Sequence, residues 1–269
     1  MRVTLVQTFL AWGDPRGGRA HFTRLLAPLA GTTDLVVLPE TFTTGFDMRG
    51  GERAESMDGP TCQWLRAEAQ RLDAALLGSV FIRDAAGVHN RALWATPDGA
   101  LAHYDKRHLF RMAGEHQHYA AGEAAVTVEW RGARIAPLVC YDLRFPVWSR
   151  RRAGYDYDLL VYVANWPAPR HLAWQRLLRA RAIENQAYVV GVNRVGDDGN
   201  GIAHRGGSAA IEPLLGEPLV ELGDTASLAT VTLDLAALRD LRARFPVALD
   251  ADAFELGSPA GAASRGSPS

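Results

Sequence analysis

Short apolar runs alternate with amphipathic helical patterns along almost the whole chain of 269 residues. The runs "DLVVLPE" at 34–40, "DLLVYVAN" at 158–165 and "AYVVGVN" at 187–193 are typical of buried strands, because they are short and rich in valine and leucine. Helical patterns occupy residues 17–30, 60–73, 146–154, 169–186 and 236–245. The alternation of the two patterns predicts an α/β fold.

Two turn sequences interrupt a pure strand–helix repeat. "TPDG" at 96–99 and "PLLGEP" at 213–218 each lie between two apolar runs, and such turns join antiparallel strands. We therefore expect mixed sheets, each covered by helices on one side and by a second sheet on the other. Since no linker divides the chain, we predict one domain over residues 1–255. Residues 256–269 are rich in glycine, serine, proline and alanine, and we predict a flexible tail there.

Composition excludes several classes of protein. A hydrophobic content of 48% is sufficient for a large core, whereas the net charge of -1 is uninformative about partners. The basic stretch at 144–154 is too short to predict nucleic-acid binding, and we interpret it as a solvated helix face. No apolar run reaches the roughly 18 residues of a membrane span. The two cysteines, Cys62 and Cys140, form no disulfide framework, so we expect a cytoplasmic protein with reduced thiols.

Residues that can carry out chemistry follow three of the apolar runs. Glu40 ends "DLVVLPE", Lys106 follows the second strand of the "TPDG" hairpin, and Cys140 ends "RIAPLVC". Side chains at the carboxyl ends of strands converge in sheets flanked by helices. A cysteine nucleophile needs a base, and Glu40 can take its proton. Lys106 and the backbone N–H of Tyr141 can stabilise an oxyanion.

Histidine is the more familiar partner of a cysteine nucleophile. Five histidines lie in polar segments and remain candidates for the base: His103, His108, His116, His118 and His204. His116 and His118 are two residues apart but have no third ligand nearby, so we predict no metal site. They are expected to line or cover the pocket instead. "GDDGNG" at 196–201 lacks the spacing of a calcium or phosphate loop and is interpreted as a surface turn.

Three segments resemble the glutamate, lysine and cysteine motifs of the nitrilase superfamily of carbon–nitrogen hydrolases. They are "LPETFTTGF", "YDKRHLF" and "LVCYDLRFP", in this order. The resemblance runs from residue 2 to about residue 240, and it includes "RMAGEHQHYAAGE", in which Glu115 matches a second glutamate of the family and Gly122 a following glycine. Within the superfamily, these segments are most similar to bacterial omega-amidases, which hydrolyse the side-chain amides of 2-oxoglutaramate and 2-oxosuccinamate.

The resemblance implies a fold, an assembly and a site. The fold is a four-layer α-β-β-α sandwich with mixed sheets, which forms a homodimer through its helical layer. The catalytic residues it implies are Glu40, Lys106, Cys140 and Glu115, without a cofactor and with a small-molecule amide as substrate. Other activities on the same fold remain alternatives: an N-carbamoyl amino acid amidohydrolase, a nitrilase, or a binding protein without turnover.

A short dicarboxylic mono-amide carries a carboxylate at the end opposite its reacting carbonyl. An enclosed pocket must hold that carboxylate with a cation or with converging N–H groups. Candidate substrate-binding residues from the sequence are the cations Arg111, Arg144 and Arg170 and the aromatic residues Phe42, Tyr119 and Trp166. Arg144 has a structural alternative, since a salt bridge with Asp142 would hold the turn around Cys140.

Overall fold

The structure is a computed structural model that describes residues 1–257 of the chain. Two six-stranded mixed sheets form its centre. In the first sheet the strand order is β14 (Ser227–Thr232), β1 (Arg2–Gln7), β2 (Leu35–Val37), β3 (Ala75–Asp84), β4 (Gly87–Ala95) and β5 (Leu101–Asp105). Strands β1, β2 and β3 are parallel, and the others pair antiparallel.

The second sheet has the same composition of parallel centre and antiparallel edges. Its order is β13 (Pro218–Glu221), β12 (Ala209–Ile211), β9 (Tyr188–Asn193), β8 (Leu159–Ala164), β7 (Ala133–Val139) and β6 (Val128–Trp130). Strands β7, β8 and β9 are parallel. Both predicted hairpins are confirmed, since β4 pairs antiparallel with β5 across "TPDG" and β12 with β13 across "PLLGEP".

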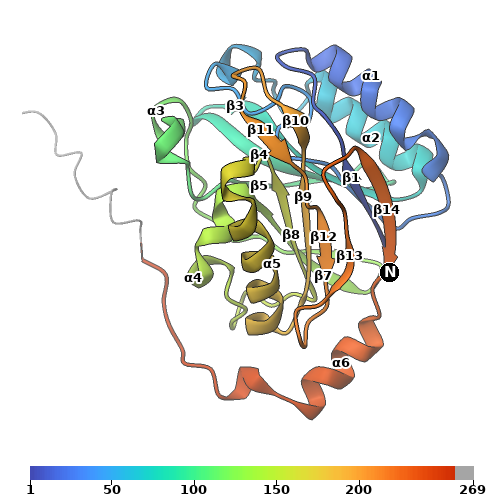
Figure 1. Cartoon of the computed structure of the whole chain (residues 1–269), viewed down its shortest axis with the longest axis vertical. Coiled ribbons are helices and arrows are strands. Elements are labelled where there is room, and N and C mark those ends of the chain that lie inside the picture. Colours follow the sequence, from blue (N-terminus) through green and yellow to red (C-terminus); the bar gives the residue numbers. More distant parts are fainter. Residues whose placement is uncertain (258–269) are drawn as a thin grey trace, which may run out of the picture.

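Helices cover the outer faces of the two sheets (Figure 1). Helices α1 (Pro15–Leu26) and α2 (Pro60–Leu72) lie on the first sheet, and α5 (His171–Asn185) lies on the second. The shorter helices are α3 (Glu115–His118), α4 (Pro146–Ser149) and α6 (Leu235–Arg244). This arrangement confirms the four-layer α-β-β-α sandwich.

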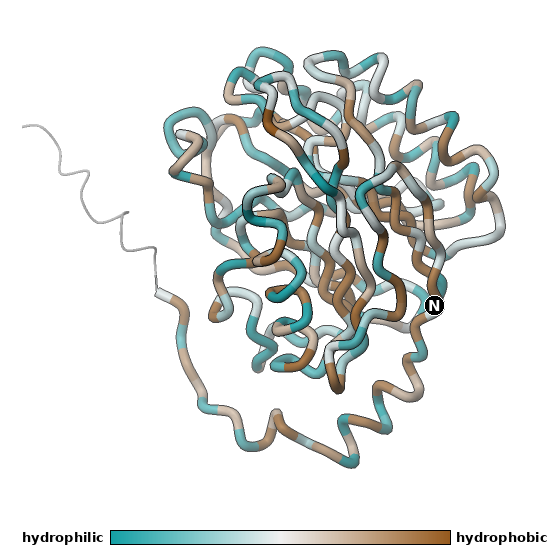
Figure 2. The backbone as a smooth tube through the Cα atoms, viewed as in Figure 1, coloured by the Kyte–Doolittle hydropathy of each residue, from teal (hydrophilic) through white to brown (hydrophobic). Residues whose placement is uncertain are grey.

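Strand β2 shows how the layers are held together. Leu35 and Val37 belong to the core between the sheets, whereas Val36 belongs to the core under α1 and α2. Because side chains alternate along a strand, a strand covered on both faces must be apolar at every position. Figure 2 shows hydrophobic colour concentrated at the centre of the molecule, where these strands lie. Strand β2 therefore packs into both hydrophobic cores.

Two features of the fold differ from expectation. The helix predicted at 146–154 ends at Ser149, because Arg151 donates its backbone N–H to the Asn185 side chain and Arg152 pairs with Tyr155. A separate hairpin of β10 (Val195–Asp197) and β11 (Ala203–Arg205) pairs with neither large sheet.

Most of the predicted flexible tail lies outside the described residues. Within residues 1–257, none of the helices is both long and apolar enough to cross a membrane.

Candidate active site

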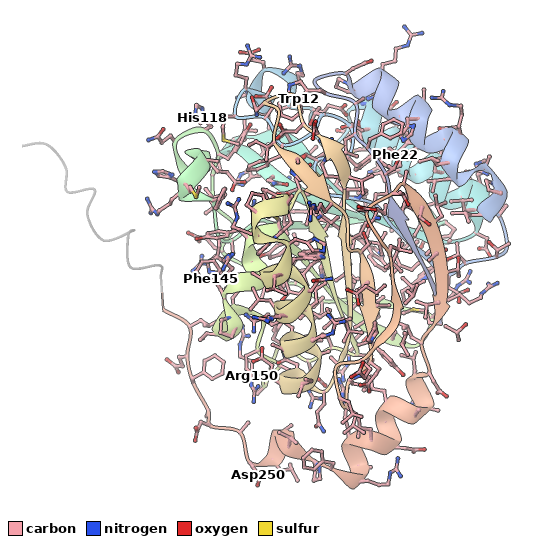
Figure 3. The ribbon with its side chains drawn as sticks, in the orientation of Figure 1. Trp12, Phe22, His118, Phe145, Arg150 and Asp250 are labelled. Atoms are coloured by element: carbon pink, nitrogen blue, oxygen red, sulfur yellow. The ribbon has the colours of Figure 1, made fainter. Side chains whose placement is uncertain are left out.

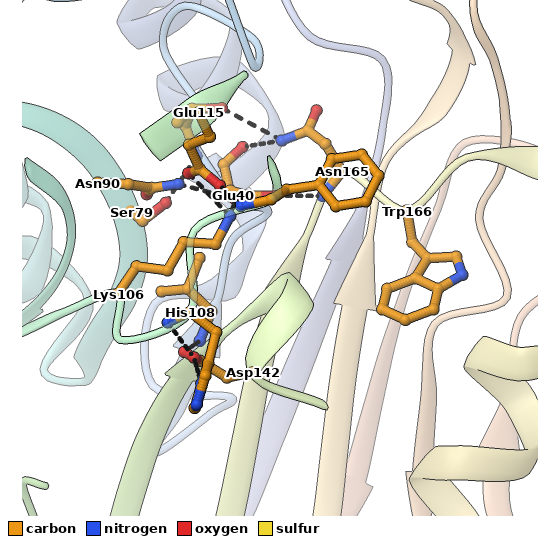
Figure 4. A network of polar contacts seen from close by, with 12 residues as sticks. Glu40, Ser79, Asn90, Lys106, His108, Glu115, Asp142, Asn165 and Trp166 are labelled. Atoms are coloured by element: carbon orange, nitrogen blue, oxygen red, sulfur yellow. Dashed lines mark hydrogen bonds and ion pairs between the residues drawn. The ribbon is translucent and has the colours of Figure 1, made fainter. Parts of the chain in front are cut away.

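The ends of β2, β5 and β7 bring Glu40, Lys106 and Cys140 to one cavity. Figure 4 shows Glu40, Lys106 and Glu115 in one network of polar contacts. The cavity has a volume of about 210 Å³. Glu40 and Lys106 are almost completely buried, and Glu115 at the start of α3 is fully buried. Four residues from three segments of the chain therefore form one polar cluster at the cavity.

Glu40 accepts hydrogen bonds at both carboxylate oxygens. Oε1 accepts from Nδ2 of Asn90 at 2.8 Å and from Nζ of Lys106 at 3.0 Å. Oε2 accepts from the backbone N–H of Asn165 at 2.7 Å. These donors fix the carboxylate in one orientation, as a base in an enclosed site requires.

Lys106 lies between two carboxylates. Its Nζ donates to Oε1 of Glu40 and to Oε1 of Glu115, both at 3.0 Å. Burial by itself would lower the pKa of Lys106, but Glu115 and Glu40 outweigh it and raise the pKa above its ordinary value. An ammonium has three N–H donors, so one remains for a further acceptor. The site thus holds a positive charge with a donor to spare.

Glu115 is fixed in turn by the loop before it. The backbone N–H of Phe110 donates to Oε2 of Glu115, and Lys106 occupies the other oxygen. Burial, together with the charge of Glu40, raises the pKa of Glu115, while Lys106 opposes the shift. Both carboxylate oxygens of Glu115 are thus occupied within the protein, so its contacts suit a role in holding Lys106.

Cys140 occupies a strained position at the end of β7. Its φ of 42° lies in the left-handed region, which residues with a side chain rarely adopt. Burial and the negative charge of Glu40 raise the pKa of the thiol well above its ordinary value, and Lys106 opposes the shift. The resting thiol is therefore protonated near neutral pH, and a base must remove its proton at the moment of attack.

A second polar network lies beside the cluster and is centred on Asp142. The fully buried carboxylate accepts from the backbone N–H of Val139 at 3.0 Å and from the Tyr104 hydroxyl at 2.8 Å. It also accepts from the backbone N–H of His108 at 3.0 Å, and its Oδ1 lies 2.8 Å from His108 Nδ1. Asp142 therefore links the segment that carries Lys106 to the turn that carries Cys140.

Aromatic and charged side chains form the rest of the cavity wall. Besides the polar cluster, the lining residues are Phe46, Met48, Phe110, Ala113, Tyr141, Arg144, Asn165, Trp166, Pro167, Arg170, Asp198, Asn200, Ile202 and His204. The Arg144 guanidinium lies 5.1 Å above the Trp166 ring, and that of Arg170 lies 5.1 Å above the Phe110 ring. Stacking on aromatic rings thus holds two guanidinium groups at the cavity wall.

Three of the predicted substrate-binding residues lie elsewhere. Phe42 is part of the core under α1 and α2, because it packs edge-on against Phe22 on the helix side of the sheet. Tyr119 is buried against Phe81, and its hydroxyl donates to the backbone carbonyl of Asp47. Arg111 is exposed on the short helix η3 (Arg111–Ala113). The prediction that these three line the pocket is therefore wrong, whereas Arg144, Trp166 and Arg170 do line it.

Two further interpretations are corrected by the structure. The predicted salt bridge between Asp142 and Arg144 does not form, because Asp142 is fully occupied by other donors and Arg144 stacks on Trp166. The "GDDGNG" turn is not merely a surface turn, since Asp198 and Asn200 line the cavity.

His204 is the one candidate histidine among the lining residues of the described chain, and burial lowers its pKa. His116 and His118 are not among the lining residues, contrary to expectation; His118 is exposed at the far end of α3 (Figure 3). Within residues 1–257, no group of three or more His, Cys, Asp or Glu residues is arranged to hold a metal ion.

A family model described as carbon-nitrogen hydrolase matches residues 2–243. The chain belongs to the carbon-nitrogen hydrolase family. It is 52% identical over 258 residues to omega-amidase YafV of Escherichia coli, and the match covers 95% of this chain and 98% of that protein. It is 32% identical over 248 residues to the 2-oxoglutaramate amidase of Bacillus subtilis, covering 91% of this chain and 95% of the relative.

Solved carbon-nitrogen hydrolases have the same fold. The crystal structure of a CN-hydrolase superfamily protein from Xanthomonas campestris matches with a TM-score of 0.94 and 54% identity. That protein carries an arsenic adduct in its active site. The match covers 96% of this chain and 99% of that one. An amidase of Nesterenkonia matches with a TM-score of 0.79 and 28% identity, covering 92% of this chain and 98% of that one.

Asn90 and Asn165 are site residues that the sequence predictions missed. Asn165 follows β8 as Glu40 follows β2, so the rule used for the other strand ends could have found it. Asn90 lies inside β4 between two buried positions, where a polar side chain is a signal of a specific partner. Phe46 and Met48 carry no such signal.

Replacing Asp142 by asparagine is expected to slow hydrolysis by about 10- to 100-fold. The asparagine amide has the same shape but turns an NH₂ group toward N–H and O–H donors, so the segments carrying Lys106 and Cys140 shift apart. Ammonia release and the rate of Cys140 alkylation should both fall. Asp240→Asn, at an exposed position on α6, is the matched control and should match the parent protein. Equal rates in the two variants would show that Asp142 does not position these residues.

Proposed function

We propose that the chain is an amidase that hydrolyses the terminal amide of short 2-oxo dicarboxylic acid mono-amides, such as 2-oxoglutaramate and 2-oxosuccinamate. The observation that carries this proposal is the pair of guanidiniums, Arg144 and Arg170, in a small cavity that also holds Cys140. The single carboxylate of such a substrate can form charge-assisted hydrogen bonds with these guanidiniums. The 52% identity to an omega-amidase supports the same substrate class.

The reaction we propose has two acyl-transfer steps. Glu40 removes the thiol proton while Cys140 attacks the amide carbon, and the third N–H of Lys106 with the backbone N–H of Tyr141 holds the oxyanion. The tetrahedral intermediate collapses to a thioester, and Glu40 returns the proton to the departing ammonia. Water, deprotonated by Glu40, then attacks the thioester, and the acid and the free thiol are released.

Glu115 holds the charge on Lys106 in this scheme. Its pKa is raised by burial, yet both of its oxygens already accept hydrogen bonds within the protein. Glu40 also accepts hydrogen bonds at both oxygens, but it lines the cavity together with Cys140, whereas Glu115 is not among the lining residues. Glu40, whose negative charge acts on the pKa of Cys140, is the better base.

A homodimer and a cytoplasmic location remain predictions. Exposed apolar side chains on the helical layer support self-association, among them Leu172 and Ile183 on α5 and Leu215 in the neighbouring turn. Exposed apolar side chains that cluster are one mark of a subunit interface.

A substrate panel tests the proposed function. It comprises 2-oxoglutaramate, 2-oxosuccinamate, glutamine, an N-carbamoyl amino acid, a simple nitrile and propionamide, with ammonia release as readout. We expect the 2-oxo-acid amides to be hydrolysed fastest, because an uncharged amide leaves the two arginines of the cavity wall without an anionic partner. Preference for the nitrile or the carbamoyl compound would place the chain in another branch of the family.

Arg144→Met and Arg170→Met should each raise KM for 2-oxoglutaramate by about 10- to 100-fold, because each removes a charge-assisted hydrogen bond. The slow hydrolysis of propionamide should be unaffected, since that substrate has no carboxylate. Arg16→Met, at an exposed arginine of α1, is the control. If both variants kept the KM of the parent protein for 2-oxoglutaramate, the carboxylate would bind elsewhere.

A further inference from the structure

Trp12 lies outside the cavity lining, but it contacts two loops that line the cavity. A methyl group placed on Gly45 would come within 2.6 Å of the indole ring, and one on Gly199 within 2.2 Å. The backbones of two distant loops therefore rest directly on one half-buried side chain. Trp12 lies at the end of the molecule where the β10–β11 hairpin turns (Figure 3).

The first of these loops, residues 41–49, supplies Phe46 and Met48 to the cavity. Gly45 precedes Phe46 directly and has a φ of 72°, a conformation that disfavours any larger residue. The backbone N–H of Gly13 also donates to the carbonyl of Thr44 at 2.9 Å. The segment that carries Trp12 is therefore bonded to this loop as well as packed against it.

The second loop is the turn at residues 198–202, which supplies Asp198, Asn200 and Ile202 to the cavity. Asp198 Oδ1 accepts from the backbone N–H groups of Asn200 at 2.8 Å and Ile202 at 2.9 Å, so the turn has a fixed internal shape. Nη2 of the buried Arg194 donates to the carbonyl of Asp197 at 2.7 Å.

The placement of this turn relative to the cavity needs a contact from outside it. Its hairpin pairs with neither six-stranded sheet, so sheet hydrogen bonds do not fix where its tip lies. The base is bonded to the N-terminal segment, where the backbone N–H of Val195 donates to Thr8. At the tip, Gly199 lies directly against Trp12 of that same segment.

We propose that Trp12 is a positioning residue that sets the width of the active-site cavity, because it holds the 41–49 loop and the 198–202 turn against a single indole ring. The width in turn limits the length of the acyl chain that can reach Cys140. The limit on acyl-chain length rests on the proposed amidase function. The effect of Trp12 on the distance between the 41–49 loop and the 198–202 turn does not.

Alkylation of Cys140 tests the spacing without any substrate. Trp12→Ala should raise the rate with the bulky reagent N-benzylmaleimide, relative to the small reagent iodoacetamide, by about 10-fold, since small displacements of a wall change access strongly. Gly199→Ala should change the same ratio, because its methyl group must displace the turn or the indole.

Kinetics on amides test the consequence for specificity. In Trp12→Ala, the preference for 2-oxoglutaramate over its homologue with one more methylene should fall by at least about 10-fold, the usual discrimination that a pocket achieves per methylene. The loss should arise mainly in KM, because the polar cluster around Cys140 is untouched. If the parent protein hydrolysed none of these amides, the proposed function would be refuted. The role of Trp12 would then be tested by the alkylation ratio alone.

Two controls match these variants. Trp130→Ala removes a partly buried tryptophan of β6 that does not line the cavity. Gly223→Ala adds a methyl group where no atom lies within 4 Å. If Trp12→Ala and Gly199→Ala are as stable to heat as these controls and have the same alkylation ratio, Trp12 does not set the cavity width. Should Trp12→Ala fail to fold, Trp12→Phe and Gly199→Ala decide the question by the same ratio.

Discussion

Cys140→Ala is expected to lower amide hydrolysis by at least about 10⁴-fold while the protein remains folded. Alanine removes the attacking sulfur, and no other residue of the cluster can form the thioester. The substitution also removes a buried thiol from a residue with a φ of 42°, which alanine tolerates no worse than cysteine does. Ammonia release and thermal unfolding measure the two effects separately.

Cys62→Ala is the matched control for the nucleophile. Cys62 lies in the core under α1 and α2, and burial raises the pKa of its thiol to about 11. Cys62 does not line the cavity that holds Cys140 and Glu40, so this variant should retain turnover at some cost in stability. Mass spectrometry after treatment with iodoacetamide should find the modification on Cys140. Turnover in Cys140→Ala close to that of the parent protein would refute the thioester mechanism.

The strand-end rule accounts for most of what the sequence predicted about the site. Glu40, Lys106 and Cys140 each follow a strand, and the ends of these three strands meet at one cavity. The turn chemistry of "TPDG" likewise identified the pairing of β4 with β5. Both inferences depend on local patterns whose geometric consequences are strict.

The directions in which the loops place their side chains could not be predicted from the strand-end rule. Phe42 lies only two residues beyond Glu40, but the chain has already turned toward the helices, so its side chain joins the other core. Arg111 and Arg170 both lie on short 3₁₀ helices, yet only Arg170 stacks on Phe110 and reaches the cavity. Such differences depend on packing between distant segments, which single-sequence patterns do not encode.

The turn at 196–201 is a second segment whose place in the cavity wall could not be predicted from local sequence patterns. Its composition predicts a surface turn, and its internal hydrogen bonds agree with that. Its place in the cavity wall depends instead on a contact between Gly199 and Trp12, which are 187 positions apart in the chain. Neither residue carries a sequence signal of this contact.

Lys106→Met is expected to lower turnover by about 100- to 1000-fold, the usual cost of losing one oxyanion donor. It should also destabilise the fold by about 3–5 kcal/mol, because Glu40 and Glu115 are left as buried carboxylates without their cation. A lower rate in this variant alone therefore has two explanations: a missing donor, or a distorted site.

The double variant Lys106→Met/Glu115→Gln separates the two explanations. Glutamine removes one of the two unpaired charges, so part of the lost stability should return, as measured by thermal or urea unfolding. Turnover should stay as low as in Lys106→Met, because the oxyanion donor is still absent. Glu115→Gln alone keeps the ammonium paired with Glu40 and should cost less turnover than Lys106→Met. If the double variant regained turnover together with stability, Lys106 would act through the fold, and the oxyanion would depend on backbone donors such as the N–H of Tyr141.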